Sequence, residues 1–166
     1  MSSNAETLAA WMDIASKDLA SAVKLASPPD PQLETAVYHC QQAAEKAAKA
    51  LFVLNSENPP KQHDIGSLLS KVKQFGIDLS DLETVAEKLT DFATRYRYPT
   101  ADDDQLTPEV VEKAISDAGL FLSRVKLIIE IHKTDGQNPT GDSDVCEVCA
   151  QVPCVCPGEG RSGGTH

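Results

Sequence analysis

The sequence predicts an all-α protein, an antiparallel bundle of four long helices and one short helix, with a disordered Cys-rich tail after it. Three observations lead to this fold class. Apolar residues recur at steps of three and four through the long segments of residues 1–134, which is the period of an α-helix. The same region shows no alternating pattern typical of strands. The connections are of modest length, which favours antiparallel neighbours.

The first helix is predicted to begin at Ser3 and to end near Ala26. Ser3 and Glu6 have the spacing of a capping box, in which each side chain accepts a hydrogen bond from the backbone of the other residue. We expect Trp11, the only tryptophan, to be a core anchor. The predicted core stripe contains Leu8, Trp11, Met12, Ala15, Leu19, Ala22 and Leu25 or Ala26.

The second helix, within residues 32–55, is predicted to be the centre of the bundle. Asp30 is the expected cap and Pro31 is expected in the first turn. The apolar face consists of Leu33, Val37, Cys40, Ala44, Ala47, Leu51 and Leu54. The opposite face is too polar to be buried without partners, since it carries Gln41, Gln42, Glu45, Lys46 and Lys49.

Three further helices are predicted from their end signals. A short helix is capped by Asp64 and stopped by Gly76. Residues 80–83 have the pattern of a second capping box, which opens a helix that ends near residues 96–98, before Pro99. The last helix is capped by Thr107, has Pro108 at its first position and runs to about Lys133.

Three segments in the same order resemble the HEPN family. They are residues 38–51 in the second helix, the His63-Asp64 segment of residues 61–69, and the Arg-Tyr-Pro turn of residues 95–99. The resemblance covers roughly residues 5 to 133. It implies a helical bundle that usually dimerises. It leaves the function open, because the family includes ribonucleases, partners of nucleotidyltransferases and non-catalytic modules.

The first candidate site lies at the end of the fourth predicted helix, where Arg95, Tyr96, Arg97 and Tyr98 follow one another. Two guanidinium groups and two phenol rings suit a phosphate and a stacked base. Alternatively, Arg97 pairs with nearby acids and the tyrosines plug the bundle end. Catalytic family members carry a His four to six residues after the Arg. This chain has none at those positions, which argues against ribonuclease activity.

The second candidate site is the polar stripe of the second helix, with Gln41, Gln42, Glu45 and Lys49, together with His63. Without the family resemblance, the stripe is explained as a solvated surface with an i,i+4 pair between Glu45 and Lys49. In the resembled family, this face borders the dimer groove, which makes it a candidate wall for a nucleotide or partner. His63 is able to move protons near neutral pH, or it simply fixes the start of the short helix. We expect His39 on the helix surface.

The chain has 166 residues and a formal net charge of −10. Its acidity argues against a general nucleic-acid coat, and the lack of a signal peptide or a long apolar run predicts a soluble cytoplasmic protein. The domain boundary is predicted between residues 1–134 and the tail, 135–166. The tail carries four of the five cysteines, Cys146, Cys149, Cys154 and Cys156, which either hold zinc or remain reduced thiols.

These observations favour a binding or regulatory module over an enzyme. The leading hypothesis is a homodimer that is the partner of a small nucleotidyltransferase in a toxin–antitoxin-like pair. The alternatives are a ribonuclease with a rearranged site and a nucleotide-binding dimer.

Overall fold

The computed structural model describes residues 3–96 and 106–135, and in these ranges the chain is helical without a strand. The predicted fold class is confirmed. None of the described helices is both long and apolar enough to cross a membrane. The α-helices are α1 (Asn4–Ala26), α2 (Leu33–Leu54), α3 (Ile65–Val72), α4 (Glu83–Arg95) and α5 (Pro108–Asp135). Short 3-10 turns at Lys73–Phe75 and Ser80–Leu82 lie between α3 and α4.

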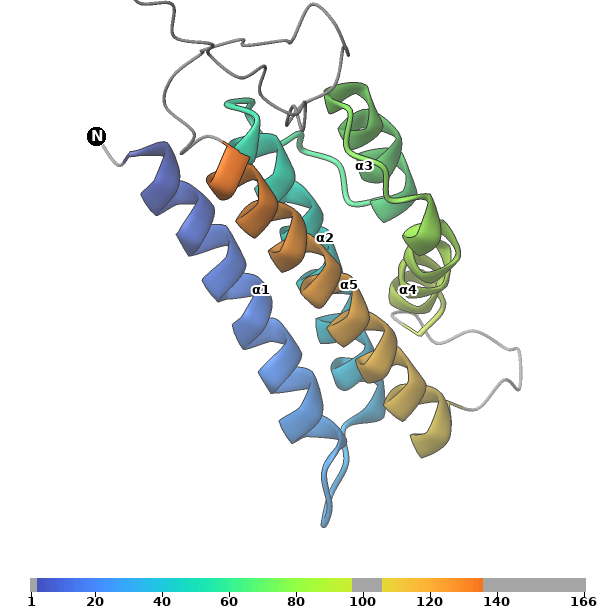
Figure 1. Ribbon diagram of the computed structural model, residues 1–166. Helices are drawn as coiled ribbons and strands as arrows, with labels where there is room; N and C mark the ends of the chain where they lie inside the picture. Colours follow the sequence, from blue (N-terminus) through green and yellow to red (C-terminus); the bar gives the residue numbers. More distant parts are fainter. Residues whose placement is uncertain (1–2, 97–105, 136–166) are drawn as a thin grey trace, which may run out of the picture.

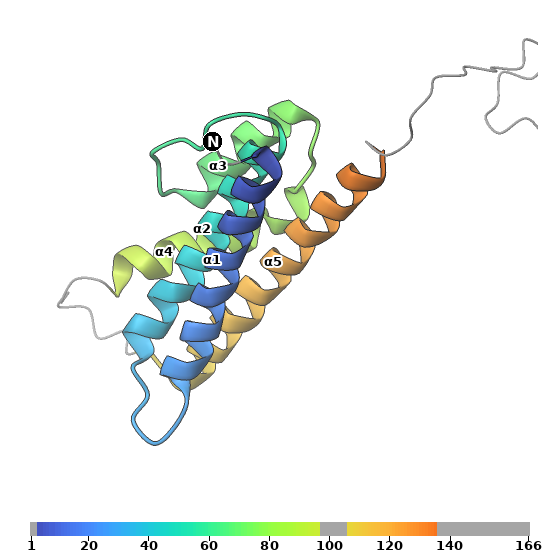
Figure 2. The same ribbon diagram turned by 90° about the vertical axis from the view of Figure 1, so that its left-hand side faces the viewer.

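Helices α1, α2 and α5 run along one another, and α3 and α4 lie on the far side of the bundle from α1 (Figure 1). Figure 2 shows α4 crossing the direction of these three helices, with its carboxyl end pointing away from α5. Helix α2 contacts each of the other four helices. The predicted central helix is therefore the centre of the fold.

The core of α2 is built from small side chains. Ala43, Ala44, Ala47 and Ala48 are fully buried, and Leu51 and Phe52 fill the space near the carboxyl end of the helix. Alanine adds little volume, so α1 and α5 are able to approach α2 closely. Larger side chains from the other helices complete the core, among them Ile65, Leu68, Leu82, Leu89, Val111, Phe121 and Val125.

Most helix ends follow the predicted signals. Ser3 and Glu6 form both hydrogen bonds of the capping box of α1. The side chain of Asp64 caps α3 by accepting from the backbone N–H of Ser67. Gly76 ends the following turn in the left-handed conformation, at a φ of 78°, which a residue with a Cβ rarely adopts. Thr107 caps α5 by accepting from the N–H of Val110.

Two predicted caps are wrong. Asp30 and Pro31 lie in the loop ahead of α2, whose N-cap is Gln32 and makes no side-chain hydrogen bond. Most residues of α2 after its first turn are buried, and this packing stabilises the helix without a side-chain cap. The proposed box at residues 80–83 is absent, because Asp78 accepts from the N–H of Ser80 at 3.0 Å and the chain first forms a 3-10 turn.

Trp11 is also placed differently from the prediction. It is only half-buried and does not belong to the set of side chains that pack on the core. The fully buried residues of α1 are Ala15 and Ala22, with Met12 and Leu19 packed partly against the core. Because α1 meets α2 through alanines, the helices are too close for an indole to enter the contact, and Trp11 stays at its edge.

Candidate functional site

A buried polar network on α2 joins most residues of the second candidate site. The carboxylate of Glu45 accepts from the Lys49 ammonium at 2.7 Å and from the Gln41 amide at 2.9 Å. Nδ1 of His63, in the loop before α3, lies 3.0 Å from the same Glu45 oxygen that Lys49 contacts. The Gln41 amide also donates to the backbone carbonyl of His63 at 3.2 Å. Gln42 joins the network through its amide, which donates to the side-chain oxygen of Gln41.

The polar stripe of α2 is therefore not a solvated surface. The side chains of Glu45 and Lys49 are only 4% and 9% exposed. The loop before α3 covers part of the stripe, because His63 in that loop contacts both Gln41 and Glu45. The predicted pair between Glu45 and Lys49 is confirmed, but it is an internal ion pair with hydrogen bonds to both carboxylate oxygens.

Glu45 stays ionised in this setting. Burial raises the pKa of its carboxyl group, but hydrogen bonds from Lys49, Gln41 and His63 and the charge of Lys49 more than offset that effect. The net result is a pKa below the ordinary value of 4.5. The buried carboxylate of Glu45 contacts Nδ1 of the His63 imidazole and fixes the orientation of the ring.

His63 is the member of the network that lies at the protein surface. Its side chain is 78% exposed, although its Nδ1 is held by a buried carboxylate. Exposed Lys61 lies two residues before it, and exposed Lys71 of α3 donates to the Gln62 side chain at 2.7 Å. The buried Nε2 of Gln62 lacks a hydrogen-bond partner within the described ranges. Cationic and donor groups thus gather at the start of α3, in a chain whose net charge is −10.

The end of α4 provides the described part of the first candidate site. Helix α4 is tied to the start of α3 by the hydroxyl of Thr90, which accepts from the N–H of Ile65 at 3.3 Å. Arg95 is exposed five residues later, about 7.5 Å further along the helix. Tyr96 is half-buried and packs on the core beside Phe92, with ring centroids 6.1 Å apart. Tyr96 therefore packs into the end of the bundle, and this position fits the structural role better than that of an exposed ring on which a base stacks.

Sequence reasoning missed a second polar cluster. Asp18 on α1 accepts from Lys46 and lies 2.9 Å from Nδ1 of His39 on α2. His39 is therefore a partly buried residue between two helices, and the surface position predicted for it is wrong. The side chain of Asp18 is 13% exposed, so the cluster mainly fixes α1 against α2. The sequence pattern does not distinguish Asp18 from the other two acids of α1, Glu6 and Asp13, so no sequence signal identified this partner.

Several predicted residues cannot be placed. Arg97, Tyr98 and the tail cysteines Cys146, Cys149, Cys154 and Cys156 lie outside the described residues, so the zinc hypothesis stays a prediction. Within residues 3–96 and 106–135, no group of three or more His, Cys, Asp or Glu is arranged to hold a metal ion. Cys40 is buried in the core, as predicted, and burial raises the pKa of its thiol to about 12.

Fold and sequence comparisons agree on the class of protein. The model of the HEPN domain matches residues 8–128, so the chain belongs to the HEPN family. The crystal structure of TT1696 from Thermus thermophilus is similar, with a TM-score of 0.63 and 26% identity over 72% of this chain and 96% of that one. ST0689, an archaeal HEPN homologue, has a TM-score of 0.60 and 27% identity over 74% of this chain and 97% of its own. A comparison with curated proteins found no match.

Proposed function

We propose that this HEPN protein is a binding module that forms a homodimer and acts as the partner of a small nucleotidyltransferase, in a pair of the toxin–antitoxin kind. We place the contact with the enzyme at the start of α3, around His63. One observation supports this placement above the others. The His63 imidazole is 78% exposed, yet it is held by a carboxylate that is 4% exposed.

Stability alone is a poor explanation for the network behind His63. Replacing a buried ion pair by apolar residues of similar volume is often neutral or stabilising, because removing two charges from water is costly. The Glu45 network therefore needs another reason to exist. Fixing His63 and its backbone carbonyl in one orientation is such a reason, since a pre-ordered surface loses less entropy when a partner binds.

The charges around His63 indicate the chemistry of the partner surface. Lys61, His63 and Lys71 suit carboxylates of a protein or the phosphates of a nucleotide held by that protein. The chain is acidic overall, so a basic patch at one place directs an anionic group to that place. A nucleotidyltransferase carries both kinds of anionic group at its active site, which needs carboxylates for metal ions and binds a nucleotide.

A ribonuclease with a rearranged site is the second candidate, and one observation favours it. Nδ1 of His63 faces the Glu45 carboxylate, so Nε2 points away from the buried network, as in an imidazole that acts as a general base. The sequence argues for binding instead. No His stands four to six residues after Arg95 or Arg97, where catalytic family members carry it. A bare nucleotide-binding dimer is the remaining alternative, and it predicts affinity for nucleotide without any protein partner.

The experiment starts from the neighbouring gene, which we expect to encode a small nucleotidyltransferase. The two proteins are co-expressed, and the complex is purified through a tag on the enzyme. We expect a stable complex that His63→Ala and Lys61→Glu weaken at least about 10-fold, as expected for loss of a contact worth about 1.4 kcal/mol. His132→Ala is the matched control, since His132 is another exposed histidine but lies at the end of α5. A complex equally strong in all three variants, or no complex at micromolar concentration, would contradict the proposal.

A further inference from the structure

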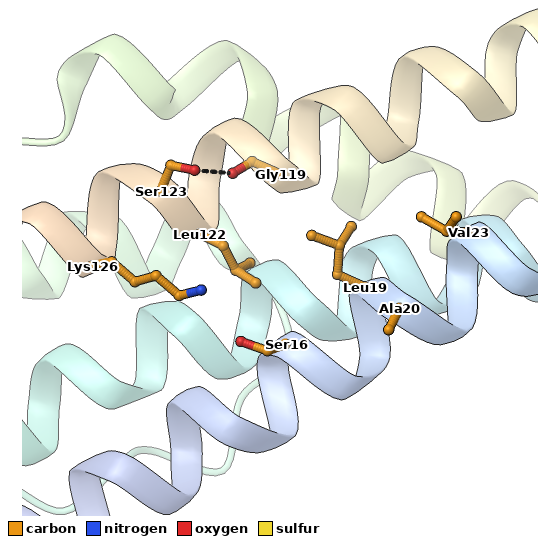
Figure 3. Close-up of a pocket in the computed structure, with 8 residues that line it drawn as sticks. All are labelled: Ser16, Leu19, Ala20, Val23, Gly119, Leu122, Ser123 and Lys126. Carbon is orange, nitrogen blue, oxygen red and sulfur yellow. Dashed lines mark hydrogen bonds between the residues drawn. The ribbon is translucent and has the colours of Figure 1, made fainter.

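Two hollows follow one another in the groove between α1 and α5. The first has a volume of about 450 Å³ and lies along the middle of α5, where Leu19 of α1 and Leu122 of α5 point toward each other (Figure 3). The second has a volume of about 300 Å³ and lies where α1 begins and α5 ends. Lys126 lines both hollows, so they form one continuous groove, which is called the α1–α5 groove below.

The floor of the second hollow is apolar and incompletely covered. Leu8 and Met12 of α1 pack against the core but are only partly buried, and Ile129 of α5 lies beside them. Ala9 is exposed at the edge of the hollow and is too small to cover these side chains. An apolar group that occupies the hollow would remove their surface from water, which is favourable.

The charged side chains of the α1–α5 groove are two lysines and one glutamate. Lys133 donates to the Glu130 carboxylate at 2.8 Å, so these two charges offset each other. Lys126 is exposed and makes no hydrogen bond or ion pair with any other residue of 3–96 and 106–135. The groove therefore offers one cation without a counter-ion next to an apolar floor, in a chain whose net charge is −10. An apolar segment with acidic residues suits such a surface.

A segment of this composition follows α5 in the sequence. Residues 145–156 contain four valines, four cysteines, one alanine and one proline, and their only charged residue is Glu147. Asp142 and Asp144 come directly before the segment. The rest of residues 136–166 contains no aliphatic residue larger than proline and no aromatic ring other than a histidine. This segment lies outside the described residues, and it is the one part of the tail with apolar side chains to bury.

The connection from α5 to this segment is long enough to reach both hollows. Helix α5 ends at Asp135, and the nine residues 136–144 lead to the segment. A flexible chain of nine residues has a root-mean-square length of roughly 17 Å. Lys126, where the hollows meet, lies nine residues before the end of α5, about 14 Å back along the helix. A tether of this length gives an effective concentration in the millimolar range, so a weak contact is enough to hold the segment.

We propose that residues 145–156 of this chain dock in the α1–α5 groove, with valine side chains over the apolar floor and with acidic residues beside Lys126. The sequence alone predicts a disordered tail, and docking changes this expectation for these twelve residues. While the segment is bound, it closes the groove to other proteins. The inference does not depend on the partner proposed at His63, because that site is at the start of α3, on the far side of the bundle from α1 (Figure 1).

The first test is a cross-link within the full chain. Cys149 is kept, and the other three tail cysteines are replaced by serine, so that neither a four-cysteine metal site nor a disulfide within the tail can form. A new cysteine is then introduced as Ala9→Cys, which lines the groove, or as the control Ala10→Cys, which is equally exposed but does not line it. Both positions are at nearly the same distance from the end of α5, so tethering alone favours neither of them.

Mild oxidation at low micromolar concentration should form the disulfide to Cys149 at least about 10-fold faster in Ala9→Cys than in Ala10→Cys, because docking raises the local concentration of the segment at the groove. Peptide mapping identifies the link, and the mass of the product shows that it lies within one chain. Equal rates in the two variants, or links only between separate chains, would overturn the inference.

Nuclear magnetic resonance on the full chain in reducing buffer gives an independent readout. Val148→Ser, Val152→Ser removes apolar side chains from the segment and should shift the signals of Leu8, Met12 and Ile129, while Ile65 at the start of α3 stays unchanged. Gln137→Ser, Asn138→Ser is the control, since it alters only the polar connection and should leave the groove signals in place. Groove signals that are identical in the natural chain and the valine variant would contradict docking. Neither test requires a nucleotidyltransferase, so failure of this inference is distinguishable from failure of the proposed function.

Discussion

The ammonium of Lys49 lies 2.7 Å from the carboxylate of Glu45, one turn earlier on α2, and both side chains are shielded from solvent. The pair links the buried central helix of the fold to an exposed histidine, because the same carboxylate oxygen also contacts His63. The energetics of this pair and the presentation of His63 are therefore coupled.

Lys49→Met should destabilise the fold by about 3 kcal/mol, because it leaves a buried carboxylate without its counter-ion. Chemical denaturation monitored by circular dichroism measures the change. Lys46→Met on the same helix is the control, and its effect should be nearer ~1 kcal/mol, since the Lys46–Asp18 pair is more exposed. If the two variants lost the same free energy of unfolding, an unpaired carboxylate at Glu45 would be no more costly than one at the more exposed Asp18.

The double variant Glu45→Gln, Lys49→Met should recover much of the loss from Lys49→Met alone. Gln at position 45 keeps the shape and removes the unpaired charge, so the desolvation cost is smaller. A double-mutant cycle on the free energy of unfolding gives the coupling between the two residues. A coupling near zero would argue against a strong buried pair.

Acid should remove the stabilisation that ionised Glu45 provides. The pKa of Glu45 is lower in the folded state than its ordinary value of 4.5, so the unfolded chain binds a proton more readily. The contribution is therefore fully present above about pH 4.5 and is lost as the pH falls toward and through the folded-state pKa. Unfolding measured from pH 7 to pH 3 should show a shallower acid loss in Glu45→Gln, and identical slopes would contradict this assignment.

Cys40 should not react with thiol reagents in the folded protein. Burial raises its pKa from 9.0 to about 12, which lowers the thiolate fraction about 1,000-fold at pH 8, and the side chain is fully buried as well. With the four tail cysteines replaced by serine, a colorimetric reagent should detect no thiol until denaturant is added, and then one per chain. Rapid reaction in buffer would show that the core of α2 opens.

Gly119→Ala should stabilise the protein by about 0.5–1 kcal/mol. Gly119 is inside α5, where glycine weakens a helix, and a Cβ there would lie 3.9 Å from Leu19, an ordinary contact. Gly76→Ala is the control. A Cβ at position 76 would have open space around it, but residues with a Cβ rarely adopt a φ of 78°, so we expect this variant to lower the stability of the protein. Melting temperatures measured at low protein concentration separate these effects from dimerisation.

The sequence predicted the parts of the structure that depend on local pattern. The helices, the Ser3 box, the Asp64 cap and the Gly76 stop depend on side chains a few residues apart, and all are confirmed. The burial of Glu45 was not predictable in this way. Helical periodicity separates its face from the apolar stripe, but only the position of the loop before α3, which brings His63 against Glu45, shows that this part of the polar face is covered.

Contacts between α1 and α2 were likewise not predictable from local sequence patterns. Asp18 meets His39 and Lys46 only because of how α1 is rotated against α2, and local spacing does not report that rotation. Trp11 was expected in the core from its size and its place on the stripe, but the close alanine contact between the two helices excluded it. For the candidate site, His63 and the polar stripe of α2, which includes Gln41, were predicted. The hydrogen bonds through which Gln41 joins Glu45 to His63 were not.

Incubation of the purified protein with RNA is the most direct test of the proposed binding role, because a binding module is expected to leave RNA uncut. Structured and unstructured RNA should stay intact over hours, both with the natural protein and with Arg95→Ala and His63→Ala. The sequence lacks the His that would complete an Arg-based ribonuclease site after Arg95, and His63 is assigned here to binding. Cleavage by the natural protein that either substitution abolishes would contradict the account and identify the chain as a ribonuclease with a rearranged site.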